Sequence, residues 1–216
     1  MKSNSEEHVV RIAVGAVALE GNLTLPGEAR GVVLFAHGSG SGRFSPRNRY
    51  VAQQLNDAKL ATLLVDLLTP NEEAIDLQTA HLRFDIGLLA ERLVAAADWL
   101  TQFPATRQLR LGYFGASTGA GAALVAATER PDVVGAVVSR GGRPDLAGPA
   151  LAHVQAPTLL IVGGNDFVVI DLNRKALAQL RCKKELVIVP GATHLFEEPG
   201  TLDQVAKLAR EWFERL

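Results

Sequence analysis

The sequence predicts an α/β protein whose mostly parallel, doubly wound sheet carries helices on both faces. Three observations support this fold class. Short apolar runs alternate with segments whose apolar residues recur at helical spacing. Runs such as GVVLFA, at residues 31–36, are apolar throughout, which is typical of parallel strands buried on both faces. Two further runs flank Gly15 near the N-terminus and predict an antiparallel strand pair before the parallel part begins.

The first half of the chain supplies four predicted strands, at residues 8–14, 16–25, 31–36 and 60–67. Pro46 suits the first turn of a helix, and Val51 and Leu55 follow it at helical spacing. An apolar stripe predicts a second helix over residues 82–100. Residues 69–82 are the one generous insertion, and we expect them to form a minimal lid over part of the cleft.

The second half continues the alternation, with predicted strands at residues 109–114, 133–138, 158–162 and 185–189. The predicted helices cover residues 117–128 and 172–180, and a closing helix starts at Thr201. Thr201 and Gln204 fit a capping box for that helix. A Gly/Pro-rich loop, RGGRPDLAGP, separates two of the strands. We find no internal repeat or linker, so residues 1–216 are expected to form a single domain.

Composition narrows the function classes. The chain has 216 residues, 48% hydrophobic, and a formal net charge of −1, which favours neither nucleic acid nor an anionic membrane as partner. Its only cysteine, Cys182, excludes an internal disulfide and a multi-cysteine zinc site. The polar, acidic N-terminal segment differs from a signal peptide, and no uncharged run is long enough to span a bilayer. We therefore expect a soluble, cytoplasmic protein.

The segment GASTG joins the predicted strand at 109–114 to the helix at 117–128. Gly-x-Ser-x-Gly at such a junction is the pattern of a nucleophile elbow, whose tight turn lifts the serine hydroxyl above the sheet. It would present Ser117 as a nucleophile and place the Thr118 amide at a helix N-terminus, facing a developing oxyanion. The alternative is a glycine-rich turn with an incidental serine.

The loop HGSGSGR follows the buried strand at 31–36. An acyl-transfer site needs a second backbone N–H at the oxyanion, and we expect Ser39 to supply it, with Gly40 as second choice. A phosphate-binding loop is not supported, because neither the Walker A motif nor the dinucleotide fingerprint is present. A structural loop without ligand remains an alternative, and His37 is expected to shape the loop through local hydrogen bonds.

Asp166 and His194 each stand just past a predicted strand end, so the chain order is serine, acid, histidine. A serine hydroxyl needs a base such as imidazole to remove its proton, and the imidazole needs a carboxylate to fix its tautomer. Carboxyl ends of parallel strands share one edge of the sheet, so we expect these side chains to meet there. Asp171 is the second choice for the acid.

Five arginines follow strands that end at the same edge: Arg43, Arg47, Arg49, Arg140 and Arg143. Arg43, Arg140 and Arg143 are the candidates for binding an anionic substrate, because guanidinium groups recognise carboxylates and phosphates. The alternative is a solvated rim or internal salt bridges, with Asp66 and Asp145 as partners.

The motifs LFAHGSGSGR, LGYFGASTGAGAAL, LLIVGGNDFVV and VPGATHLFEEPG, in this order, resemble the α/β-hydrolase superfamily and within it the dienelactone hydrolase-like group. The resemblance implies Ser117 as nucleophile, His194 as base, Asp166 as its orienting acid, and the Ser39 and Thr118 amides as oxyanion hole. It also implies a small-molecule substrate, a monomer or small homo-oligomer, and no metal or cofactor. Dienelactone hydrolases proper carry a cysteine nucleophile, so a serine here favours a serine esterase that cleaves an ester, lactone or thioester. A non-catalytic binding protein on this fold and an acyltransferase with the same triad remain alternatives.

Overall fold

The computed structural model describes residues 5–216. Residues 1–4, which begin the segment in which we expect no signal peptide, lie outside that range. The chain forms one eight-stranded sheet whose strands are β1 (Ser5–Val14), β2 (Val17–Pro26), β3 (Gly31–Ala36), β4 (Leu60–Val65), β5 (Arg110–Ala116), β6 (Val134–Arg140), β7 (Thr158–Gly163) and β8 (Lys184–Val189). Their order across the sheet is β1-β2-β4-β3-β5-β6-β7-β8. Strand β2 pairs antiparallel with both β1 and β4, and the pairs from β4 to β8 are parallel. The predicted fold class is confirmed.

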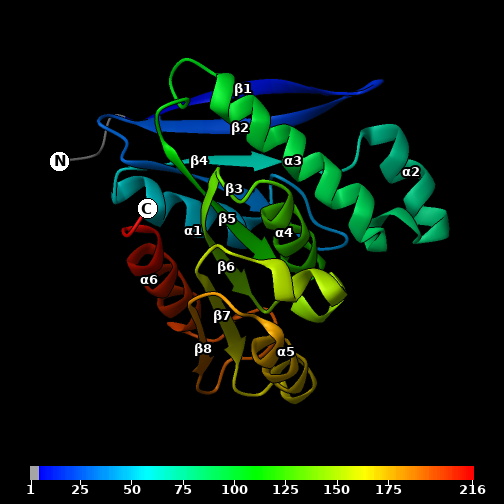
Figure 1. The fold of residues 1–216 in the computed structure, drawn as a ribbon, viewed down its shortest axis with the longest axis vertical. Coiled ribbons are helices and arrows are strands. Elements are labelled where there is room, and N and C mark those ends of the chain that lie inside the picture. Colours follow the sequence, from blue (N-terminus) through cyan, green and yellow to red (C-terminus); the bar gives the residue numbers. More distant parts are fainter. Residues whose placement is uncertain (1–4) are drawn as a thin grey trace.

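Helices cover both faces of this sheet (Figure 1). They are α1 (Pro46–Asp57), α2 (Pro70–Thr79), α3 (Ile86–Gln102), α4 (Thr118–Glu129), α5 (Phe167–Gln179) and α6 (Thr201–Phe213), with 3-10 segments η1 (Leu82–Phe84) and η2 (Pro144–His153). Helices α3, α4 and α5 lie in front of the sheet in Figure 1, and α1 and α6 lie behind it. Helix α2 stands apart at the side, beyond the end of β4.

Two apolar clusters fill the layers on either side of the sheet. The larger one joins strand residues such as Leu34 and Leu63 to Leu93 and Ala97 of α3. The second joins Phe35 and Phe114 to the α1 and α6 residues, among them Leu55, Trp212 and Phe213. This burial follows from the sequence, since the central strands have no polar face to present to water.

Four local predictions differ from the structure. The predicted capping box at Thr201 is wrong, because the N-cap is Gly200 in a left-handed conformation and the Thr201 hydroxyl donates to the Glu198 carbonyl. Helix α5 begins at Phe167, five residues before the predicted start. The insertion at 69–82 contains a helix, α2, with its own capping box between Thr69 and Glu72. The Gly/Pro-rich loop after β6 leads into η2, which is kinked at Gly148.

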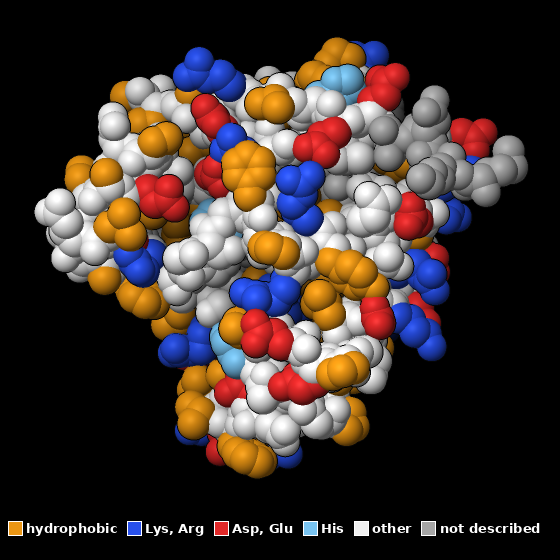
Figure 2. Space-filling view, turned by 180° about the vertical axis from the view of Figure 1, so that it is seen from behind, with side chains coloured by type: hydrophobic (Ala, Val, Ile, Leu, Met, Phe, Trp, Pro, Cys, Tyr) orange, Lys and Arg blue, Asp and Glu red, His pale blue; other side chains and the backbone are white. Residues whose placement is uncertain are grey.

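The parallel strands β3, β5, β6, β7 and β8 end at one edge of the sheet, and the loops that follow them carry the candidate site residues. None of the helices within residues 5–216 combines the length and hydropathy that crossing a membrane would take. Basic and acidic side chains are interspersed on the face seen in Figure 2, in keeping with the small net charge.

Candidate active site

Ser117 occupies the turn between β5 and α4, with φ 50° and ψ −123°. This backbone conformation is unfavourable for any residue with a side chain, and it persists only where the surroundings impose it. The neighbours show why glycines flank it. A Cβ on Gly115 would lie 2.5 Å from the Ala120 Cα, and a Cβ on Gly119 would lie 2.3 Å from the Ala36 carbonyl oxygen. A tight, strained turn of this kind is the geometry that a nucleophile elbow needs, and Ser117 is partly exposed.

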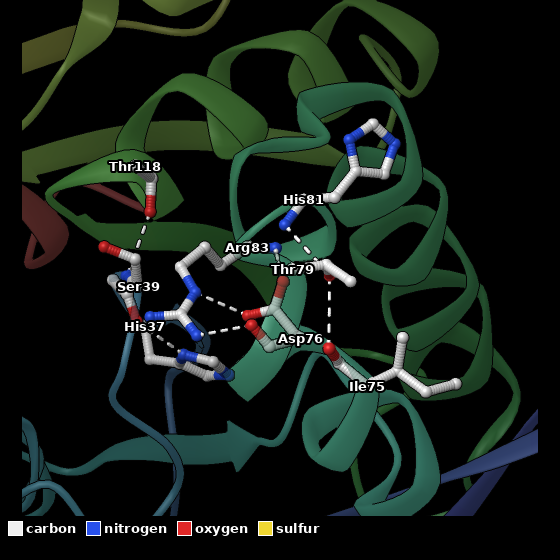
Figure 3. A network of polar contacts seen from close by, with 9 residues as sticks. His37, Ser39, Ile75, Asp76, Thr79, His81, Arg83 and Thr118 are labelled. Carbon is white, nitrogen blue, oxygen red and sulfur yellow. Dashed lines mark hydrogen bonds and ion pairs between the residues drawn. The ribbon is translucent and has the colours of Figure 1, made fainter.

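The loop after β3 lies directly against this elbow. A Cβ on Gly38 would come within 2.9 Å of the Ser117 Cβ, so only glycine fits there. The Ser39 amide donates to the Thr118 hydroxyl at 3.0 Å (Figure 3). Within the described part of the chain the Thr118 amide has no acceptor, as expected for the first residue of a helix. Both predicted oxyanion donors are therefore close to Ser117, and one of them is engaged by a side chain.

Asp166 and His194 form a hydrogen-bonded pair. His194 Nδ1 lies 2.6 Å from Asp166 Oδ2, and the carboxylate is the more buried partner. An acceptor at Nδ1 fixes the neutral ring as the Nδ1–H tautomer and leaves Nε2 as the basic nitrogen. Asp171, the second choice for the acid, lies within α5, is exposed and pairs with Arg174.

The loops that carry the acid and the histidine are joined backbone to backbone. The Asn165 amide donates to the Ala192 carbonyl at 2.9 Å, and the Gly164 amide donates to the Val189 carbonyl at 2.8 Å. A Cβ on Gly163 would lie 2.5 Å from two carbonyl oxygens of the histidine loop. The Thr193 amide donates to Glu198. Hydrogen bonding from the Thr193 side chain, and after it from this amide, lowers the pKa of the Glu198 carboxyl. The position of His194 is thus determined by several contacts outside its own side chain.

Ser117 and His194 line one cavity of about 240 Å³. Its other walls come from the β3 loop, the start of α1 and the end of β6, and include Ser39, Ser41, Ser45, Arg47, Asn48 and Arg140. Among the described residues Ser117 Oγ has no hydrogen bond, including to His194. Catalytic contacts of this kind are often long before substrate binds and shorten in the complex.

The three candidate arginines have different surroundings. Arg43 is paired with Glu20 at 2.6 Å and with Asp66, and Arg143 is paired with Asp145 at 2.7 Å. The hydrogen bond to Asp145 raises the pKa of Arg143. These two arginines therefore have the carboxylate partners that the salt-bridge alternative named. Arg140 differs, because it is 6% exposed, lines the cavity and, among residues 5–216, donates only to the neutral Asn48 Oδ1 at 3.1 Å.

Burial, and after it the charge of Arg47, lower the pKa of Arg140 to about 10. Arg47 lines the same cavity and reaches the rim, where it contacts Glu197 at 3.2 Å. Arg47 belongs to the group of five arginines in the sequence, but it is not among the three candidates for anion binding. Spacing in the chain could not separate it from Arg43, because only the direction of α1 carries it to the cavity.

His37 shapes the β3 loop through both ring nitrogens. Nδ1 contacts the Gly38 carbonyl at 2.9 Å, and Nε2 lies 3.0 Å from the Leu67 amide. A carbonyl only accepts and an amide only donates, so the ring is neutral with its proton on Nδ1. Burial lowers the pKa of His37, which keeps it in this form. The structure supports the predicted structural role.

On the other side of this loop lies the α2 segment (Figure 3). Asp76 of α2 is buried, accepts from the Arg83 amide at 3.0 Å and pairs with its guanidinium. A smaller cavity of about 50 Å³ lies between α2 and the β3 loop and is lined by His37, Ser39 and Asp76 among others. Within residues 5–216 no cluster of three metal-binding side chains occurs.

Comparisons of this chain with known proteins identify one family and several similar structures. Residues 24–216 match the Dienelactone hydrolase family. A crystal structure named as dienelactone hydrolase from Anabaena variabilis is 67% identical, with a TM-score of 0.96 over 98% of both chains. Est1E from Butyrivibrio proteoclasticus is 16% identical, covers 96% of this chain and 98% of its own, and has a TM-score of 0.79, which is a likeness of fold alone.

One curated relative is longer than this chain. A Mycobacterium tuberculosis protein named provisionally as a phosphoribosyl transferase is 61% identical over 204 residues. The match takes in 94% of this chain and 45% of that protein, so the chain spans less than half the length of this relative.

Proposed function

The chain belongs to the dienelactone hydrolase family, and on this premise we propose that it is a serine hydrolase that cleaves a small carboxylic ester, lactone or thioester. One observation carries the proposal. His194, whose Nδ1 is hydrogen-bonded to Asp166, lines the same cavity as Ser117, which is held in the strained conformation of an elbow. A nucleophile and a base on one cavity, with an acid behind the base to orient it, are what acyl transfer requires.

In the proposed reaction Ser117 Oγ attacks the carbonyl carbon while His194 Nε2 takes its proton. Asp166 stabilises the imidazolium through Nδ1–H, and the imidazolium then protonates the leaving alcohol as the acyl–oxygen bond breaks. Water attacks the acyl-enzyme by the same route and regenerates Ser117. The Thr118 amide is the first oxyanion donor, and the Ser39 amide joins it when the Thr118 hydroxyl releases it.

The test is hydrolysis of a short p-nitrophenyl ester by the purified protein. Ser117→Ala is expected to lower kcat by at least about 10³-fold, and Asp166→Asn by a similar factor, because the imidazole loses its orienting acceptor. Asp171→Asn is the matched control, since it removes a carboxylate from the exposed side of the neighbouring helix, and it should retain full activity.

A fluorophosphonate probe separates this function from non-catalytic binding. It should label the wild-type protein at Ser117 and fail to label Ser117→Ala. Turnover that survives Ser117→Ala would contradict the proposal. Acyl transfer to an acceptor other than water would be recognised by product analysis with added alcohols.

A further inference from the structure

Two arginines are deeply buried in the described chain, and they differ in one respect. Arg92 is 5% exposed and its guanidinium pairs with Glu72 at 2.7 Å. Arg140 is 6% exposed and has no carboxylate within ion-pair distance among the described residues. Its Nη2 donates to the Asn48 amide oxygen, and its Nε is buried without an acceptor. A buried charge without a counter-ion is costly, and native proteins rarely retain one without a reason.

The backbone of Arg140 places this charge next to the nucleophile. Arg140 ends β6, is in register with Ala116 of β5, and its carbonyl lies 3.4 Å from the Ser117 amide. The Arg140 side chain reaches Asn48 in α1. Arg140, Asn48 and Ser117 all line the 240 Å³ cavity. The charge is therefore fixed on both sides, by a strand and by a helix, beside the position of the reacting carbonyl.

Arg47 adds a second positive charge to the same wall. Its Nε is also buried without an acceptor, and its one carboxylate partner, Glu197, is mostly exposed at the rim. None of the described residues that line this cavity is acidic. Two guanidinium groups thus share one cavity, and the carboxylate of Glu197 at the rim pairs with Arg47. Burial of Arg140, and after it the charge of Arg47, lowers the pKa of Arg140.

We propose that Arg140, assisted by Arg47, binds an anionic group of the substrate, a carboxylate or a phosphate, carried by the ester that Ser117 attacks. This inference rests on the proposed function and names its substrate class. An anion supplies the acceptors that both Nε groups lack, and charge-assisted contacts of this kind are stronger than neutral hydrogen bonds. The cavity has a volume of about 240 Å³, which is enough for the acyl group and its anionic end.

The experiment compares two esters that share the reacting aryl ester and differ at the far end, where one carries a carboxylate and the other its neutral methyl ester: mono(4-nitrophenyl) glutarate and 4-nitrophenyl methyl glutarate. The wild type should prefer the anionic ester in kcat/KM by about tenfold or more. Arg140→Gln should lower kcat/KM for the anionic ester by about 10- to 100-fold and change the neutral ester less than about threefold. Arg140→Lys should give an intermediate loss, since it keeps the charge but not the planar fork. Equal effects on both esters would overturn the anion subsite.

Two further variants test whether the effect is specific to this cavity. Arg47→Gln alters a half-exposed residue that should fold normally, and it should lower the preference for the anionic ester by about threefold to tenfold. Arg174→Gln removes the same charge from the exposed surface of α5 and should leave both esters within about twofold. A preference that falls equally in Arg174→Gln would indicate a general effect of net charge and would overturn the proposal.

A binding measurement separates this inference from the proposed function. Millimolar glutarate or inorganic phosphate should raise the melting temperature of Ser117→Ala relative to sodium chloride of equal ionic strength, and should not do so after Arg140→Gln is added. The more effective anion identifies the group that is bound. Absence of this stabilisation would overturn the subsite whether or not esters are cleaved. Stabilisation without any hydrolysis or probe labelling would overturn the proposed function alone.

Discussion

His37 shows how one buried side chain holds the oxyanion loop in place. Its ring joins the Gly38 carbonyl to the Leu67 amide and so ties the β3 loop to the end of β4. The Nε2 contact needs the neutral ring, because a protonated Nε2 could no longer accept from the amide, whereas Nδ1–H donates to the carbonyl in either form. The folded pKa is lowered by burial, so the unfolded chain takes up a proton at a higher pH than the folded chain.

The free energy of unfolding should therefore fall as the pH drops below about 6.5, the ordinary histidine value, until the lower folded pKa is reached. His37 contributes at most about 1.4 kcal/mol per pH unit to this slope. His37→Gln should lower the free energy of unfolding by about 1–2 kcal/mol at pH 7.5, because hydrogen bonds are lost. It should also make the free energy of unfolding less dependent on pH below about 6.5.

Urea unfolding at pH 5.0 to 7.5 measures this difference, with the exposed His153→Gln as control. The expected pattern is a gap between wild type and His37→Gln that narrows as the pH falls. A gap that stays constant across this range would refute the assignment of the slope to His37.

At the candidate site, the position of a residue after a strand end was the most useful sequence signal. Ser117, Asp166 and His194 were predicted because each directly follows a buried run, and the structure places all three at one edge. The arginines could not be sorted in this way. Whether a guanidinium group meets a carboxylate depends on side-chain directions, so only the structure separates Arg140 from Arg143.

Helix α2 is the element that sequence patterns missed. Its apolar residues do not form a buried stripe, and Ile75 and Leu77 are exposed. Exposed hydrophobic side chains gather at this edge of the molecule, on the left in Figure 2. What holds the helix is polar: the Thr69 cap, the pair of Glu72 with Arg92, and the pair of Asp76 with Arg83. Most other boundaries were predicted within a few residues, because strands buried on both faces give a strong signal.

Burial alone would raise the pKa of Asp76, but its hydrogen bonds with Arg83 outweigh burial and lower it. Asp76→Asn should therefore loosen α2 locally and raise amide hydrogen exchange over residues 70–84 by about tenfold or more, since that pair connects α2 to η1. Global unfolding should change little, because α2 lies outside both apolar clusters.

Hydrogen exchange with mass spectrometry measures the effect segment by segment. Glu73→Gln is the matched control, because it removes a carboxylate from the exposed side of the same helix. Exchange that rises equally in the two variants would show that the Asp76–Arg83 pair does not hold the segment.

At the scale of the whole molecule, closely packed core residues and the candidate site residues lie at opposite ends of the same strands. Phe213 is fully buried against Gly112 in the first half of β5, whereas Ser117 follows the end of that strand. A Cβ at Gly112 would lie 2.5 Å from the Phe213 ring, so the central strand and the closing helix fit closely.

Phe213→Ala should lower the free energy of unfolding by about 3–5 kcal/mol through lost burial and the cavity left behind. The kcat/KM of the folded protein should stay within about twofold, since the cavity walls are unchanged. Urea unfolding and ester turnover measure the two quantities, and Phe84→Ala, at an exposed phenylalanine, should have little effect on stability. A large fall in kcat/KM of folded Phe213→Ala would contradict this separation.

The last residue also lies at the non-catalytic end. Leu216 packs beside Gly31 and Gly135, where β3 and β6 begin, on the side of the sheet away from the Ser117 cavity. An engineered fusion at Leu216 would therefore attach its partner at the end of the sheet opposite the Ser117 cavity.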